Sequence, residues 1–194
     1  VSAYPMYVAK TGAGLVQPIS MPPIVLSGTT AGGVNTYYVG FGTGKYLEFT
    51  DKVAALQNSF YMLHDNGTSS SPAGGSVIPS RGRLQPGVVN TTTQVITISP
   101  FKWGRAASDT DATQRSGWYF DFIATGERTI SPISAIGSNL RFGSLIPAAV
   151  AVAGTCVSGG GGNVFDVDAD TGLGTFNSSN VGLFGESLIF NIAS

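Results

Sequence analysis

The feature that most constrains this chain is a succession of short apolar runs, each bounded by glycine, proline, asparagine, aspartate or serine. The bounding residues supply turns, and the aromatic and β-branched residues inside the runs favour strands. One short helix is expected at residues 51–57, with Thr50 as its N-cap. Residues 66–75 and 158–162 are expected to be surface loops. Strands are expected at residues 3–8, 19–26, 36–41, 59–64, 94–99, 117–122, 128–131, 139–146, 163–167 and 187–192. The sequence therefore predicts an all-β fold.

An internal repeat makes the prediction more specific. Residues 18–67 and 132–172 each contain a Pro-Ile step, then an apolar run with a central glycine, then a run that begins with Phe and ends in Asp-x-Gly. Three antiparallel strands closed by a tight turn are typical of the blades of a β-propeller. We expect a partial β-propeller of roughly two to three blades, because complete rings have about 4–8. Residues 1–194 are expected to form one segment of such a domain, without an internal domain boundary.

Charge and hydropathy exclude several classes of protein. Only 11% of the residues are charged and the net charge is −1, so no basic stripe is available to bind nucleic acid. No apolar run approaches the ~20 residues of a membrane-spanning helix. Cys156 is the only cysteine, so no disulfide closes within the chain. Its thiol is expected either to lie in the core or a loop, or to pair with a segment outside this chain.

Three ordered blocks of residues carry a family resemblance. The first block contains residues 39–47 (Val-Gly-Phe-Gly-Thr-Gly-Lys-Tyr-Leu), Asp51 and residues 57–65. The second contains residues 81–84, 117–122 (Gly-Trp-Tyr-Phe-Asp-Phe) and 126–128 (Gly-Glu-Arg). The third contains residues 145–147, Cys156 and residues 168–172 (Asp-Ala-Asp-Thr-Gly). In this order the blocks resemble the C-terminal propeller of the PilC/PilY family of type IV pilus adhesins.

The resemblance implies a structural role for the matching residues, which are Gly42, Thr43, Gly44, Asp51, Asp65, Gly117, Trp118, Cys156, Asp170 and Gly172. It also implies a non-enzymatic protein at the pilus tip or outer-membrane surface, outside the cell, that supports pilus assembly and adhesion. The implied partners are pilus subunits (minor pilins), the remainder of the same propeller and a receptor on a host cell or surface. Variable contacts are expected in the loops at residues 66–75 and 158–162.

Calcium is the one cofactor that the residues suggest. Asp166, Asp168 and Asp170 alternate before Gly172, as in a calcium-binding loop. The position that supplies a glutamate ligand in an EF-hand is Asn177, however, and the alternative is a solvated strand face. The resemblance implies a calcium site in the propeller, but its loop does not match these residues.

Two other classes of protein remain open. An exported quinoprotein-like propeller enzyme would use Asp121, Arg128 and Trp118, the most suitable residues in the chain for such a pocket. A phage or surface-layer β protein would lack the three ordered blocks. His64 is the only histidine and ends a predicted strand, where a turn residue is the ordinary interpretation.

Overall fold

The computed structural model describes residues 4–29, 35–53, 55–65, 76–148 and 160–179, and these residues form an all-β structure. Two short 3₁₀ helices, η1 (Phe49–Val53) and η2 (Arg81–Arg83), interrupt the strands. No helix in these ranges is long and apolar enough to cross a membrane. The strands are β1 (Ile24–Thr29), β2 (Asn35–Gly42), β3 (Ser59–Asp65), β4 (Gln85–Asn90), β5 (Val95–Ile98), β6 (Gly117–Asp121), β7 (Arg128–Thr129), β8 (Ser134–Ile136), β9 (Asn139–Leu145), β10 (Gly162–Asp168) and β11 (Gly174–Ser179).

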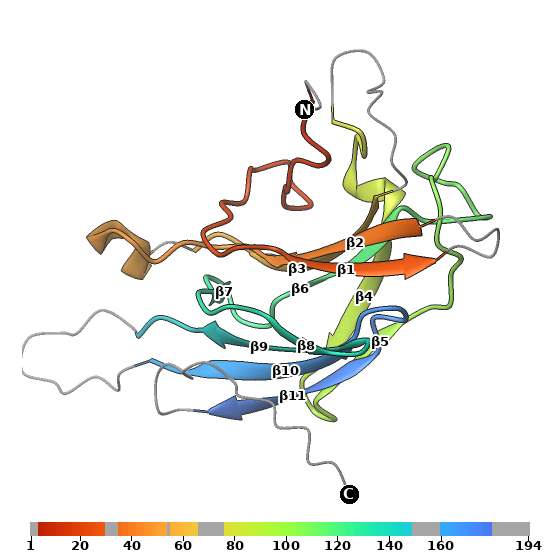
Figure 1. Ribbon diagram of the computed structural model, residues 1–194. Helices are drawn as coiled ribbons and strands as arrows, with labels where there is room; N and C mark the ends of the chain where they lie inside the picture. Colours follow the sequence, from red (N-terminus) through yellow and green to blue (C-terminus); the bar gives the residue numbers. More distant parts are fainter. Residues whose placement is uncertain (1–3, 30–34, 54, 66–75, 149–159, 180–194) are drawn as a thin grey trace, which may run out of the picture.

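All these strands belong to one curled sheet with the order β1-β2-β3-β6-β4-β5-β11-β10-β9-β7, and β8 pairs with β9. We call β1-β2-β3-β6 the first unit and β5-β11-β10-β9, with β8, the second unit. Pairing within each unit is antiparallel. Strand β4 pairs with β6 in parallel over two residue pairs and then with β5 in antiparallel, so it passes from one unit to the other. As a result, the two units lie face to face (Figure 1).

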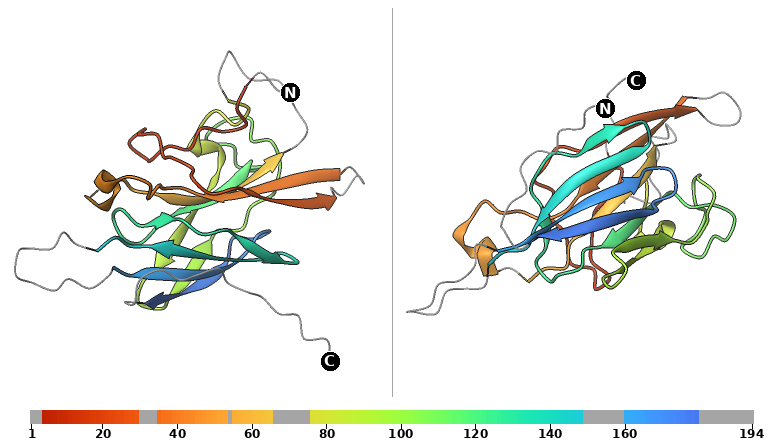
Figure 2. Two further views of the ribbon diagram at one scale, coloured as in Figure 1. Left: turned by 60° about the vertical axis from the view of Figure 1, so that its left-hand side comes forward. Right: turned by 90° about the horizontal axis from the view of Figure 1, so that it is seen from below.

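The main core lies between the two units. Alternate residues of a strand share one face, and in the first unit Phe60, Met62, Trp118 and Phe120 therefore point to the same side. The rings of Phe60 and Phe142 stack across the interface at 4.2 Å between centroids and 8° between planes. The layering is visible from the side and from below (Figure 2). Aromatic packing thus joins strands that are distant in sequence.

The outward faces of the two units differ. Tyr61 and Leu63 of the first unit belong to a second buried cluster, to which Ala9 of the N-terminal segment also belongs. The outward face of the second unit instead carries an ion pair between Arg141 and Asp166, 3.6 Å apart. One outer face is therefore largely apolar and covered, whereas the other carries polar side chains.

Several predicted boundaries were wrong, for identifiable reasons. The strand expected at 19–26 begins at Ile24, because Pro22 and Pro23 lack the N–H groups that a ladder requires. Residues 4–8 contribute only an isolated bridge between Tyr7 and Ile78. The helix expected at 51–57 is the shorter η1, and Thr50 lies inside it instead of capping it. The strand expected at 128–131 is limited to the two residues of β7.

The internal repeat corresponds to β1-β2-β3 and β8-β9-β10, because each triplet pairs as an antiparallel meander. The Pro-Ile steps lie outside the strands, and Ile19 makes only an isolated bridge to Gly44. Strands β4 and β11 were not predicted, and the strand expected at the second Pro-Ile step, residues 132–133, is instead β8, which begins at Ser134. The strand expected at 187–192 and the loop at 66–75 lie outside the described residues, as do residues 158 and 159.

Candidate functional site

The first block lies directly against the end of the second block, and we call this the first interblock contact. The backbone N–H of Thr129 donates to the carbonyl of Thr43 at 3.1 Å. A side chain on Gly44 would collide with Cβ of Arg128, and one on Gly42 would collide with the hydroxyl of Thr129. Gly44 also has a φ of +119°, which side-chain-bearing residues rarely adopt. Both glycines are therefore required by close packing.

Arg128 connects this contact to the loop that follows β2. Its guanidinium is buried, with 2% of the residue exposed. Nη1 donates to the carbonyls of Lys45 at 2.7 Å and Asp51 at 2.8 Å, and Nε donates to the carbonyl of Gly126 at 2.8 Å. Burial lowers the pKa of Arg128. These partners are backbone carbonyls, so the charge is used to fix the loop at residues 45–51.

Asp51 closes the same loop from the inside. Its Oδ2 accepts hydrogen bonds from the N–H groups of Leu47 at 2.8 Å and Glu48 at 2.9 Å, and its Oδ1 lies 3.4 Å from Nζ of Lys45. The bonds from Glu48 and Leu47, followed by the charge of Lys45, lower the pKa of Asp51. Asp51 therefore stabilises from within a turn that Arg128 of β7 binds from outside.

Glu127, a residue of the second block to which the sequence assigned no role, organises a buried polar network. Its side chain is fully buried and accepts hydrogen bonds from Nδ2 of Asn163 at 2.7 Å, from the hydroxyl of Ser144 and from the N–H of Ala124 at 3.0 Å. Nδ2 of Asn58, the residue before β3 of the first unit, donates to the carbonyl of Glu127 at 2.8 Å. A buried carboxylate is tolerated only when it is hydrogen-bonded in this way. The network links both units through residues 58, 127, 144 and 163.

The second block also meets the third block, and we call this the second interblock contact. The indole N–H of Trp118 donates to the carbonyl of Ala169 at 2.9 Å. Gly172 has a φ of +69°, and a Cβ there would lie 3.0 Å from Cδ2 of Trp118. Trp103 donates its indole N–H to the carbonyl of Asp170 at 2.8 Å. Two tryptophans thus hold the turn between β10 and β11.

The other residues to which the resemblance implies a structural role lie outside the two interblock contacts. Gly117, with φ +152°, begins β6, and a side chain there would collide with the carbonyl of Met62. Asp65 ends β3, and its carbonyl accepts a bond from the hydroxyl of Thr36 at 2.9 Å. Cys156 lies outside the described residues, so its pairing stays a prediction.

The three aspartates suggested for calcium do not converge. Asp166 pairs with Arg141, whereas Asp168 accepts from the N–H of Thr171 at 2.8 Å and from the hydroxyl of Ser138 at 2.6 Å. The bonds to Asp168 lower its pKa against the opposing effect of burial. Within the described ranges no group of three or more His, Cys, Asp or Glu residues is placed to hold a metal ion. Calcium therefore stays a prediction without geometric support.

Asp121, Arg128 and Trp118, suggested for an enzyme pocket, each serve a different contact. Asp121 forms an ion pair with Arg81 and accepts from the hydroxyl of Ser59 at 2.6 Å. The guanidinium of Arg81 lies 3.9 Å above the ring of Tyr119. Arg128 and Trp118 take part in the two interblock contacts. All three residues therefore connect separate segments of the chain.

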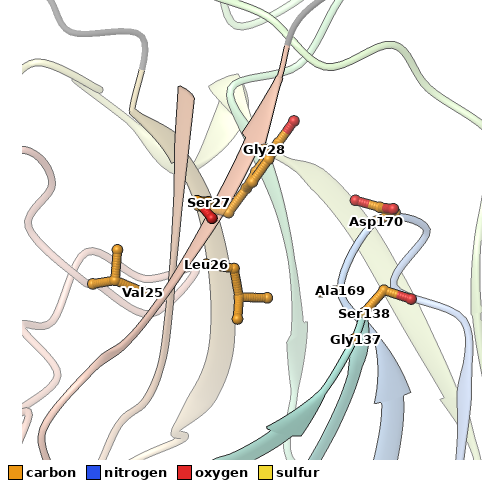
Figure 3. A pocket seen from close by; sticks show the side chains of 9 residues that line it. Val25, Leu26, Ser27, Gly28, Gly137, Ser138, Ala169 and Asp170 are labelled. Carbon is orange, nitrogen blue, oxygen red and sulfur yellow. The ribbon is translucent and has the colours of Figure 1, made fainter. Parts of the chain in front are cut away.

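One open groove lies between the two units, with a volume of about 650 Å³. Residues 25–28 of β1 line one side, together with Tyr38 of β2. Gly137 and Ser138 of the β8–β9 turn and Ala169 and Asp170 of the β10–β11 turn line the other side. Figure 3 shows Ser138 and Asp170 on these turns, opposite Leu26 and Ser27 of β1. This groove is the candidate binding site of the described structure.

No protein-family model matches the chain. The type IV pilus biogenesis factor PilY1 of Pseudomonas aeruginosa strain PAO1 is 29% identical over 160 residues, which cover 74% of this chain and 13% of that protein. The PilY1 homolog of Xylella fastidiosa is 26% identical over 189 residues, covering 91% of this chain and 11% of that protein. The crystal structure of the P. aeruginosa PilY1 C-terminal domain superimposes with a TM-score of 0.63 at 26% identity, over 88% of this chain and 35% of that one. The chain thus spans a small part of its curated relatives.

The face-to-face antiparallel units, held by aromatic packing and buried polar cross-links, define a propeller-type β scaffold with an open groove. The comparisons indicate which propeller proteins the chain resembles. The chain is similar to the C-terminal β-propeller domain of PilY1 proteins, which supports a place in the PilC/PilY family as a part of that domain.

Proposed function

We propose that the chain is part of a type IV pilus biogenesis factor that acts as an adhesin at the pilus tip, outside the cell. The observation that carries the proposal is the match to PilY1 proteins over 74% and 91% of the chain. Gly44 and Trp118, two of the residues that carry the family resemblance, lie in the two interblock contacts, which supports a structural role for them. The proposed role is to present a rigid binding surface, without catalysis.

The remainder of the propeller is the first proposed partner. Blades of a propeller pack against one another, and the outward face of the first unit still exposes Val25 and Tyr37, at 57% and 50%. These residues continue the face that carries Val39 and Leu63, because Val25 pairs with Val39 and Val39 with Leu63. We propose that a neighbouring blade covers this face. The polar face around Arg141 and Asp166 would then remain towards solvent.

Pilus subunits, including minor pilins, and a receptor on a host cell or surface are the further proposed partners. The test is deletion of the gene in the source bacterium, followed by quantification of sheared surface pili and of attachment to epithelial cells and glass. Loss of both, restored by the intact gene, is expected. Unchanged piliation and attachment in the deletion strain would refute the proposal.

A complementing gene with Arg128→Ala provides a structural control. Because Arg128 binds the loop at residues 45–51, this variant should behave like the deletion. A Glu48→Ala gene, which alters an exposed residue of the same loop, should restore both properties. If the two variants behave alike, piliation and attachment do not depend on the folded structure of this segment.

A further inference from the structure

The groove between β1 and the turns of the second unit has the features of a small-ligand site. Its volume of about 650 Å³ falls within the range of ~300–1,000 Å³ that such sites occupy. It is open to solvent and bordered by segments from both units, as ligand sites between structural units commonly are.

The β1 side of the groove offers main-chain polar groups. Side chains of consecutive strand residues point to opposite faces, so four consecutive residues, 25–28, can line one groove only along the strand's edge. Among the described residues, β1 pairs only with β2. Along its other edge, alternate residues present both an N–H donor and a C=O acceptor. A ligand here meets donors and acceptors together.

The side chains add an aromatic ring and a carboxylate. The Tyr38 ring packs against Gly28, where an added Cβ would lie 2.7 Å from the ring, and contacts Trp103 at 4.8 Å between centroids. Asp170 is exposed, and its charge raises the pKa of Tyr38, after the larger effect of burial. Ser138 contributes a hydroxyl oxygen and Leu26 an apolar surface. Neither Lys nor Arg is among the described lining residues, which disfavours anionic ligands.

From this combination we infer that the groove binds a neutral saccharide. A sugar ring has an apolar C–H face that packs on an aromatic or aliphatic surface, and hydroxyls that both donate and accept hydrogen bonds. The ring of Tyr38 and the side chain of Leu26 can pack against the C–H face of the sugar. The edge of β1 and the carboxylate of Asp170 can form hydrogen bonds with its hydroxyls. A simple ammonium ion would leave the N–H groups of β1 unused. The inference deepens the proposed adhesion by naming the class of receptor, and its biological use rests on that proposal.

The test uses the intact 194-residue chain and the methyl glycosides of glucose, galactose, mannose and N-acetylglucosamine. At least one probe should show saturation transfer and shift the backbone amides of residues 25–28, 137–138 and 169–170. Asp170→Asn should weaken its binding at least tenfold, because a charged acceptor is lost. Asp166→Asn, on the outward face of the same unit, should leave it unchanged.

Three results would overturn the inference. The first is the absence of shifts at these amides with any of the glycosides, and the second is equal binding by wild type and Asp170→Asn. The third is binding of choline or of a blocked peptide at these residues while all glycosides remain silent. Attachment of bacteria carrying Asp170→Asn is a separate readout. If the chain binds sugar but this strain attaches normally, the groove assignment stands and the adhesive role fails.

Discussion

Arg128 occupies the space that any side chain on Gly44 would need, so these two residues determine how closely the first and second blocks approach. Gly44→Ala is therefore expected to introduce both backbone strain at φ +119° and a collision with Cβ of Arg128. We expect a loss of ~2–4 kcal/mol in the free energy of unfolding, measured by urea denaturation.

Gly14→Ala is the matched control, because Gly14 also has a positive φ, of +85°, but no atom lies within 4 Å of an added Cβ. Its cost should be limited to strain of about 1–2 kcal/mol. If Gly44→Ala costs no more than this control, the close approach of Arg128 does not constrain position 44.

Removal of the Glu127 carboxylate should destabilise the fold more than its position in a short loop suggests. Glu127→Ala removes the acceptor of the Asn163 amide and of the N–H of Ala124, and leaves the Ser144 hydroxyl only the longer bond to the carbonyl of Asn163, at 3.4 Å. Unpaired buried polar groups cost ~1–3 kcal/mol each, and with partial relaxation a total of about 3 kcal/mol is expected. Thermal and urea unfolding measure the effect. The exposed Glu48→Ala should stay within about 0.5 kcal/mol of wild type, and similar losses in both variants would argue against the network.

The two tryptophans should report different environments. Trp118 is fully buried, so a Trp103→Phe variant should show blue-shifted emission that acrylamide quenches weakly. Trp118→Phe should leave a red-shifted, more accessible emission and cost about 2 kcal/mol through the lost bond to Ala169 and the smaller ring. Equal quenching of the two variants would contradict the burial of Trp118.

The pH dependence of stability near neutrality should arise mainly from His64, the only histidine. Burial lowers its pKa, opposed by Asp65, and Nε2 lies 2.6 Å from the hydroxyl of Thr36. A folded-state pKa below the unfolded value of ~6.5 means that protonation favours unfolding. Stability is thus complete above this value and declines as the pH falls through it towards the folded-state pKa.

His64→Gln should flatten this decline, as measured by urea midpoints from pH 8 to pH 5.5. A decline of unchanged steepness in His64→Gln would assign the effect to other groups.

Much of the strand content was predictable because the core strands concentrate aromatic residues. Phe60, Trp118, Phe142 and Phe165 each lie in a strand predicted from the sequence, and all four contribute to the core. Strand β11 was missed because Phe176 is its single buried residue among polar ones. Strand β4 was missed because Pro86 and Gly87 indicate a turn, although Pro86 lies in the short parallel pairing with β6.

The family blocks identified the residues of the interblock contacts but not the contacts themselves. No local pattern predicts that Gly44 meets Arg128, since their approach depends on the curling of the sheet. The alternating aspartates were read as ligands, whereas Asp168 caps a turn through Thr171, a short-range pattern typical of aspartate. The groove could not be predicted, because it is formed by an edge strand and two turns that only the fold brings together.

The reach of Arg128 also has a kinetic consequence. Its hydrogen bond to Lys45 spans 83 residues, and that to Asp51 spans 77. During synthesis from the N-terminus, the carbonyls of Lys45 and Asp51 can bond only to water until residue 128 has been added. The loop at residues 45–51 therefore cannot complete its hydrogen bonds before β7 has formed, and such non-local closure slows folding. A chain interrupted before residue 128 should therefore remain sensitive to proteases at residues 45–51.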